Sequence, residues 1–92
     1  MLKFSDLEFK QHPHVPGNNA VQALKFFSNG YGVSVVRFPG SYGYLQGLYE
    51  VAVIEGTDKE YELCYDTPIT DDVLGHLDEQ DVENIIKEVA AL

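Results

Sequence analysis

Apolar and polar residues alternate along short segments in the first two-thirds of the chain, and this period of two is typical of half-buried β-strands. The alternation predicts strands over residues 7–12, 20–27, 31–38, 48–55 and 60–65. Turn-forming residues separate these segments, and the Asn29-Gly30 pair is the strongest hairpin signal among them. Because the connections are short, the strands are expected to follow one another as an antiparallel meander.

Near the C-terminus the period changes from two to that of a helix. Asp78 is a good N-cap, and the residues after it place one apolar stripe at helical spacing. This stripe consists of Val82, Ile85, Ile86, Val89 and Ala90. Thr70 can cap a short helical turn that Gly75 ends. The prediction is one α+β domain over residues 1–92, an antiparallel meander of four or five strands packed against a C-terminal amphipathic helix that a short helical turn precedes.

The charge of the chain is unevenly distributed. The net charge is −9, and residues 1–49 carry four basic and two acidic side chains, whereas residues 50–92 carry two basic and thirteen acidic ones. Direct binding to nucleic acid needs a basic footprint, which the chain lacks, and an anionic membrane is disfavoured for the same reason. The acidic half can attract a basic protein surface, or it can serve only to keep a small domain soluble.

The sequence contains no strong motif for metal binding or catalysis. His12, His14, Cys64 and His76 are the soft metal ligands of the chain, but they lack the paired spacing of a zinc site. The serines lack a nucleophile-elbow context. We therefore expect no metal, no cofactor and no enzymatic activity. A lone cysteine, no apolar run near 20 residues and no signal-peptide pattern predict a cytoplasmic protein.

The most unusual segment is the glycine- and tyrosine-rich loop at residues 39–47. Glycines such as Gly43 let a backbone approach a ligand closely, and Tyr42 and Tyr44 offer large contact faces. The loop lacks the Gly-Lys-Ser/Thr ending of a phosphate-binding loop. It is either a flexible hairpin loop folded onto the sheet or a binding loop, in which case Tyr31 and Tyr49 complete the lining of a pocket for a small molecule.

Carboxylates gather after the last predicted strand. Asp66, Asp71 and Asp72 form an acidic corner whose spacing does not fit an EF-hand, and such residues are also common in turns and first helical turns. We expect a partner protein to be bound by this corner together with the start of the helix. The predicted contact carboxylates are Asp66, Asp71, Asp72, Asp78, Glu79, Asp81 and Glu83.

Three blocks of the sequence support a resemblance. They are FSNGYGVSVVR at residues 27–37, GLYEVAV at 47–53 and LCYDTPITDDVLG at 63–75. Through them the chain resembles a family of small, mostly uncharacterised proteins encoded by bacteriophages and related mobile elements. The resemblance assigns no catalytic residue to this chain. It implies an accessory protein in the host cytoplasm that occupies a host or phage protein, including a nucleic-acid-binding one, by imitating the charge of a phosphate backbone.

Three functions follow as hypotheses. The first is a non-enzymatic accessory protein that binds a basic protein partner through its acidic half, with Tyr42 and Tyr44 as anchors. The second is a small-molecule or nucleotide-binding module that uses the loop at 39–47. The third is a virion or assembly component that forms homo-oligomers through an exposed edge strand, for which residues 7–12 are the candidate.

Overall fold

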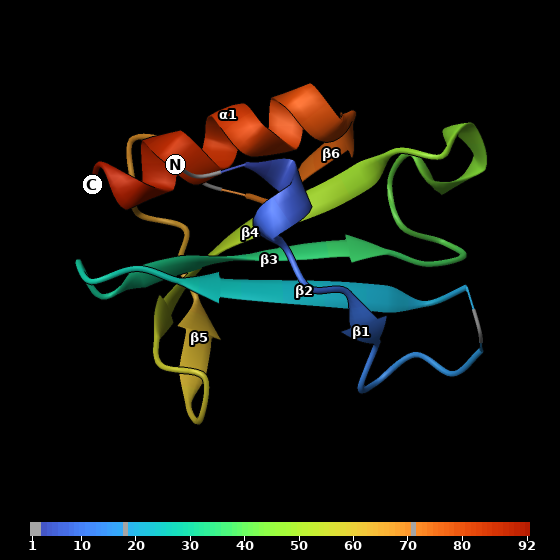
Figure 1. Ribbon diagram of the computed structural model, residues 1–92, viewed down its shortest axis with the longest axis horizontal. Coiled ribbons are helices and arrows are strands. Elements are labelled where there is room, and N and C mark those ends of the chain that lie inside the picture. Colours follow the sequence, from blue (N-terminus) through green and yellow to red (C-terminus); the bar gives the residue numbers. More distant parts are fainter. Residues whose placement is uncertain (1–2, 18, 71) are drawn as a thin grey trace.

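An antiparallel sheet and one α-helix form the fold in the computed structural model, which describes residues 3–17, 19–70 and 72–92 (Figure 1). The strands are β1 (Lys10–Gln11), β2 (Val21–Phe26), β3 (Tyr31–Arg37), β4 (Tyr49–Gly56), β5 (Tyr61–Leu63) and β6 (Leu74–Leu77). The helix is α1 (Glu79–Ala90), and Phe4–Asp6 and Tyr44–Gln46 form short 3-10 turns, η1 and η2. The strands follow the order β1-β2-β3-β4-β5, and β6 also pairs with β4. The predicted α+β meander with a C-terminal helix is confirmed.

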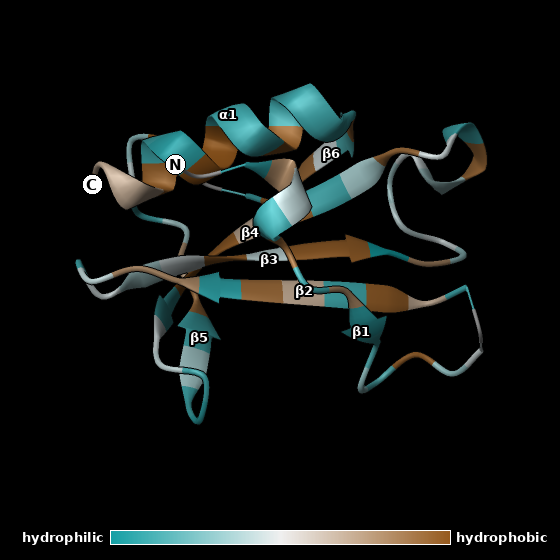
Figure 2. Ribbon diagram, viewed as in Figure 1, coloured by the Kyte–Doolittle hydropathy of each residue, from teal (hydrophilic) through white to brown (hydrophobic). Residues whose placement is uncertain are grey.

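The core lies between α1 and one face of the sheet. Figure 2 shows the apolar side of the helix turned toward the strands and its polar side turned away. Four residues of the predicted stripe, Val82, Ile85, Ile86 and Val89, are buried there. They meet the sheet residues Ala23, Val33, Val35, Val51, Val53 and Cys64. Burying each large aliphatic side chain contributes about 1.5–3 kcal/mol, so this layer supplies most of the stability.

The helix begins at the predicted cap. The Asp78 carboxylate accepts a hydrogen bond from the backbone N–H of Asp81 at 2.8 Å. The Asp81 carboxylate in turn accepts one from the backbone N–H of Asp78 at 3.2 Å. This reciprocal capping box satisfies two backbone donors that the first helical turn leaves without partners.

The prediction of a short helical turn before the helix is wrong, because Leu74–Leu77 form strand β6 instead. Thr70 forms only a local turn, in which its hydroxyl accepts a hydrogen bond from Asp72 N–H at 3.1 Å. The reason lies in β4, whose outer edge is covered by β5 only at Ile54–Gly56. Strand β6 pairs with the first half of that edge, at Tyr49 and Val51, and so satisfies backbone groups that would otherwise lack partners.

The N-terminal strand is much shorter than the alternation at residues 7–12 predicts. Only Lys10 and Gln11 pair with β2. The residues before them leave the ladder, because the rings of Phe4 and Phe9 pack against Tyr49 with centroids at 5.2 and 5.5 Å. Closing this end of the core is worth more than extending an edge strand, since aromatic burial outweighs a few solvated hydrogen bonds.

The Asn29-Gly30 hairpin forms as predicted. Gly30 has φ +88°, whereas Asn29 is not in the left-handed region. Phe27 N–H also bonds to the Tyr31 carbonyl, which makes a three-residue loop with a left-handed glycine. The Asn29 amide is thereby free to reach α1, where it donates to the carbonyls of Val89, Ala90 and Leu92 at 2.9–3.3 Å.

No helix formed by the described residues covers the second face of the sheet, and yet much of its central part is buried. Ile54 is 0% exposed and Ser34 7% exposed on this face. The sheet curls over itself here, because Phe26 lies across from Gly32 and its ring meets Tyr61 edge-on at 5.8 Å. No helix in the described part of the chain is long and apolar enough to cross a membrane.

Replacing Asn29 by Ala is expected to lower the free energy of unfolding by about 1–2 kcal/mol, because the end of α1 loses a part-buried hydrogen-bond donor. Urea denaturation measures this change. Asn84→Ala is the control, since Asn84 is exposed and bonds only within the helix, to Gln80 at 3.1 Å. A loss at Asn29 no larger than that at Asn84 would mean that the hairpin does not hold the helix.

Candidate functional site

The glycine- and tyrosine-rich loop folds against β6 in a defined conformation. The backbone N–H of Tyr42 donates to the Glu50 carboxylate at 3.2 Å, and the Tyr42 carbonyl accepts from His76 N–H at 3.3 Å. The Tyr42 and His76 rings lie 6.3 Å apart. Ser41 is buried, and its hydroxyl both accepts from Phe38 N–H and donates to the Phe38 carbonyl. These contacts fix the backbone on both sides of Tyr42.

Two glycines permit this close approach. A Cβ at Gly75 would overlap the Cβ of Tyr42. A Cβ at Gly43 would lie 2.9 Å from both His76 Cα and Leu48 Cβ, and Gly43 also has φ +91°. Any larger residue would displace the loop from β6.

His76 is the only residue other than glycine with positive φ among the described residues, at +56°. The left-handed conformation costs about 1–2 kcal/mol for a residue with a side chain. A non-glycine residue held in such a conformation is common at binding and catalytic sites, where the surrounding structure imposes it. Here the β4–β6 register shift and the packing of Tyr42 impose it.

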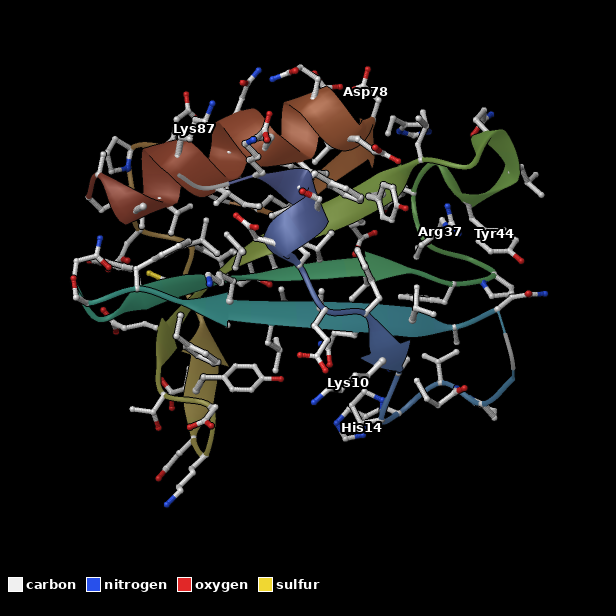
Figure 3. All side chains as sticks on the ribbon, viewed as in Figure 1. Lys10, His14, Arg37, Tyr44, Asp78 and Lys87 are labelled. Atoms are coloured by element: carbon white, nitrogen blue, oxygen red, sulfur yellow. The ribbon has the colours of Figure 1, made fainter. Side chains whose placement is uncertain are left out.

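The loop presents apolar side chains to solvent despite its fixed backbone. Tyr42 is 58% exposed and Leu45 is 92% exposed. Asp78 and Glu79 follow His76 closely in the chain, and Glu79 also lines a hollow with Lys3, Phe4 and Ser5. Figure 3 shows Asp78 at the same end of the molecule as Arg37 and Tyr44. We use the name Tyr42 surface for Tyr42 and its contact residues Glu50 and His76, together with Leu45 of the same loop and with Asp78 and Glu79, which follow His76 in the chain.

The structure does not bring the four predicted pocket tyrosines together. Tyr31 pairs with Glu55, six residues along β4 from Tyr49 or about 20 Å. Tyr49 packs under Phe4 and Phe9, and the Arg37 guanidinium lies over its ring at 5.0 Å.

Tyr44 has a different environment from Tyr42 although both belong to the same loop. It lines a shallow pocket of about 340 Å³ with Asn19, Val21, Arg37 and Gly47. Gly43, which separates the two tyrosines, turns the chain so that only Tyr42 meets β6.

The predicted acidic residues are divided between the two ends of β4. Asp78 and Asp81 form the helix cap, and the Glu83 carboxylate accepts from Phe4 N–H at 3.1 Å. Glu83 therefore docks the N-terminal segment and is only part-exposed. Glu79 is exposed in the first turn of α1.

The remaining predicted carboxylates lie elsewhere or make local contacts. Asp66 belongs to the end of the sheet where Tyr31 and Cys64 lie, and it accepts from the Cys64 thiol at 2.9 Å. Asp72 caps its neighbour, Val73 N–H, at 2.7 Å. Asp71 lies outside the described residues. The acidic half is therefore not one continuous binding strip.

The surroundings of Cys64 do not favour a nucleophilic thiolate. The hydrogen bond to Asp66 and burial in the core raise the pKa of its thiol, which disfavours the reactive thiolate. Partial burial, together with Glu55, Cys64 and Asp66, raises the pKa of the Tyr31 hydroxyl.

The histidines likewise form no metal site. Burial and the neighbouring His14 lower the pKa of His12, whose ring packs edge-on against Phe38 at 5.3 Å. Among the residues that the structure describes, no three His, Cys, Asp or Glu side chains are arranged to hold a metal ion.

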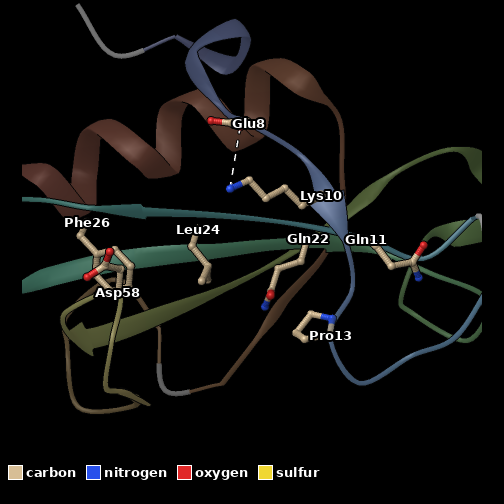
Figure 4. A pocket seen from close by; sticks show the side chains of 8 residues that line it. All are labelled: Glu8, Lys10, Gln11, Pro13, Gln22, Leu24, Phe26 and Asp58. Atoms are coloured by element: carbon tan, nitrogen blue, oxygen red, sulfur yellow. Dashed lines mark ion pairs between the residues drawn. The ribbon is translucent and has the colours of Figure 1, made fainter.

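A second hollow lies on the face of the sheet opposite α1. This groove of about 480 Å³ has Gln22, Leu24 and Phe26 as its floor (Figure 4). Its walls are formed by Glu8, Lys10, Gln11, Pro13 and Asp58. Lys10 and Glu8 pair with each other at 3.8 Å, and both are more than 70% exposed. The floor thus combines two apolar residues with Gln22, whose amide already donates to the Ser34 hydroxyl at 3.0 Å. Among the described residues that line it, the groove offers no fully buried polar group to orient a small molecule.

Comparison of the chain with models of protein families, with curated proteins and with solved structures finds no match.

Sequence reasoning missed two residues of the Tyr42 surface. The sequence pattern shows Glu50 only as a residue of the predicted strand at 48–55, and it shows His76 only as a soft metal ligand without a partner at the right spacing. Their role depends on contacts between β4, β6 and the loop, and no local pattern signals such contacts.

We expect His76→Gly to be about 1 kcal/mol more stable than His76→Ala, because both variants lose the ring and only glycine adopts φ +56° without strain. Thermal or urea denaturation of the two variants measures the difference. Equal stability, or a more stable alanine variant, would show that the left-handed backbone at position 76 is not strained.

Proposed function

We propose that this chain is a non-enzymatic binding domain that captures a basic partner protein on the Tyr42 surface. The observation that carries the proposal is the exposed Tyr42 ring on a backbone that Glu50, His76 and Gly75 hold in place. Binding residues are frequently loop residues positioned by a rigid scaffold, and tyrosine is enriched among those that dominate binding energy.

Preorganisation is the energetic advantage of this arrangement. Ordering a flexible, rotamer-rich side chain at an interface costs about 0.5–1.5 kcal/mol, and a loop whose backbone is already fixed avoids part of that cost. Tyr42 also has a polar hydroxyl at the tip of its ring, so it can enter an apolar pocket and still donate a hydrogen bond. Leu45, three residues further along the same loop, adds exposed apolar area.

The negative charge of the chain favours a partner with a positive surface. The Glu50 carboxylate contacts the backbone of Tyr42, Asp78 and Glu79 follow His76 in the chain, and the whole chain carries a net charge of −9. Such rim carboxylates contribute little affinity each, but they accelerate association with a positive surface and reject a negative one. The partner we infer has an apolar pocket for one aromatic ring, rimmed by lysine or arginine.

The resemblance to bacteriophage proteins suggests where the partner comes from. A host or phage protein that normally binds nucleic acid has the required basic surface. Because the described carboxylates are split between the two ends of β4, we base the proposal on the Tyr42 surface and not on imitation of a continuous phosphate backbone.

Tyr42→Ala is expected to weaken binding of the partner at least about 30-fold, the effect of losing an interface residue worth 2 kcal/mol or more. The immobilised chain and its variants would be exposed to lysate of the source cells, and captured proteins identified by mass spectrometry. Affinities for the purified partner would then be measured by calorimetry. Tyr44→Ala is the matched control, because it removes the same ring from the same loop at a position that faces the Arg37 pocket.

The proposal requires a basic protein that the unmodified chain and Tyr44→Ala retain, that Tyr42→Ala releases, and that elutes as the salt concentration rises. A partner that binds Tyr42→Ala as tightly as the unmodified chain would contradict it. So would a partner whose affinity does not change between low and high salt.

A further inference from the structure

Strand β5 is the last strand of the sheet, and one of its edges is open. The backbone groups of Glu60 and Cys64 turn inward, because Cys64 N–H bonds to the Val53 carbonyl and Glu60 bonds with Thr57 across the turn. Successive residues of a strand direct their backbone groups to opposite sides. The N–H and C=O groups of Tyr61 and Leu63 therefore point away from β4, and no described residue pairs with this edge.

Apolar side chains remain exposed along the open edge. Leu63 is 52% exposed and Tyr65 is 43% exposed. Leu63 lies opposite Ile54 in the register, in a row that continues through Gly32 to Phe26 on the face away from α1. An added strand would place its own apolar side chains next to Leu63 and extend this row.

The opposite face of the same edge is acidic. Glu62 lies directly across from Glu55, and like charges in this position repel each other. Asp58, Glu60 and Asp66 lie in the same stretch of chain, in which Lys59 is the single basic residue. A positive side chain on an added strand, placed next to Glu62, would relieve the repulsion in the Glu55–Glu62 row.

A second copy of this chain fits the edge poorly. Pairing β5 with itself about its central residue would place Glu62 against Glu62 of the other copy, with Glu60 close by. Opposed like charges of this kind are a common protection against self-association of edge strands. The same carboxylates that reject a second copy attract a basic strand.

We propose that the open edge of β5 binds an extended segment of a partner protein, in which apolar residues alternate with lysine or arginine. The segment adds to the sheet through the backbone groups of Tyr61 and Leu63. Its apolar residues lie on the side of Leu63, and its basic residues lie on the side of Glu62 and Glu55. This recognition mode combines main-chain hydrogen bonds for affinity with alternate side chains for specificity. It uses the opposite end of β4 from the Tyr42 surface.

The test uses two synthetic peptides of nine residues with blocked ends. One alternates lysine and valine, and the other has the same composition with all lysines before all valines. The expected result, by fluorescence anisotropy at low salt, is that the alternating peptide binds at least tenfold more tightly. Equal affinity for the two peptides would overturn the proposal, since it would mean that charge and apolar content suffice without strand pairing.

Variants of β5 make the test specific to the edge. Leu63→Pro removes an outward N–H that does not bond to β4, and proline is tolerated at the solvent side of an edge strand. Leu63→Thr is the matched control, because it also removes the leucine side chain but keeps the N–H. We expect Leu63→Pro to weaken binding of the alternating peptide at least tenfold relative to Leu63→Thr, with both variants folded by circular dichroism.

A third variant, Glu62→Lys, is independent of the backbone change and is expected to weaken binding at least fivefold. Unchanged binding in Glu62→Lys would overturn the proposal, and so would equal binding by the two Leu63 variants. Loss of binding in Tyr42→Ala with retention in Leu63→Pro would also overturn it, because the peptide would then occupy the Tyr42 surface.

Discussion

A single helix has to cover a sheet that is larger than the helix itself. Twelve residues of α1 span about 18 Å and bury one face of the central strands. The described residues form no second α-helix for the other face, and there the sheet curls and packs Phe26 against Tyr61, which buries Ile54. The arrangement of the short elements at the edges of the sheet follows from the fact that α1 covers only one of its faces.

The long strand β4 shows how the margins are divided. Its outer edge is shared by two short strands, β6 at the Tyr49 end and β5 at the Ile54 end. At the first end the glycine-rich loop docks onto β6 and exposes Tyr42. At the second end nothing among the described residues continues the sheet beyond β5. The two surfaces proposed for binding thus lie at the two ends of β4, where short elements cover its outer edge.

Much of the fold was predictable because its signals are local. The Asn29-Gly30 hairpin, the period of two in β2, β3 and β4, and the Asp78 cap each depend on residues close in sequence. Strand β6 was not predictable in the same way, since Thr70 and Gly75 favour a helical turn locally and the pairing with β4 is a distant contact. Unusual composition identified Tyr42 and its loop, but not its contacts with Glu50 and His76. The acidic residues were easy to find, and Asp78 was predictable as a helix cap, but the contact of Glu83 with Phe4 N–H joins distant parts of the chain and has no local signal.

The central claim is that the Tyr42 surface is rigid before any partner arrives. Backbone ¹⁵N relaxation by NMR tests it most directly, by comparing the amides of Tyr42 and His76 with those of the central strands. The account predicts order parameters of about 0.85 for both amides, the value of rigid backbone. Values below about 0.6 at Tyr42 would contradict it and would make residues 39–47 a flexible hairpin loop that carries an exposed aromatic side chain without presenting it in a fixed position.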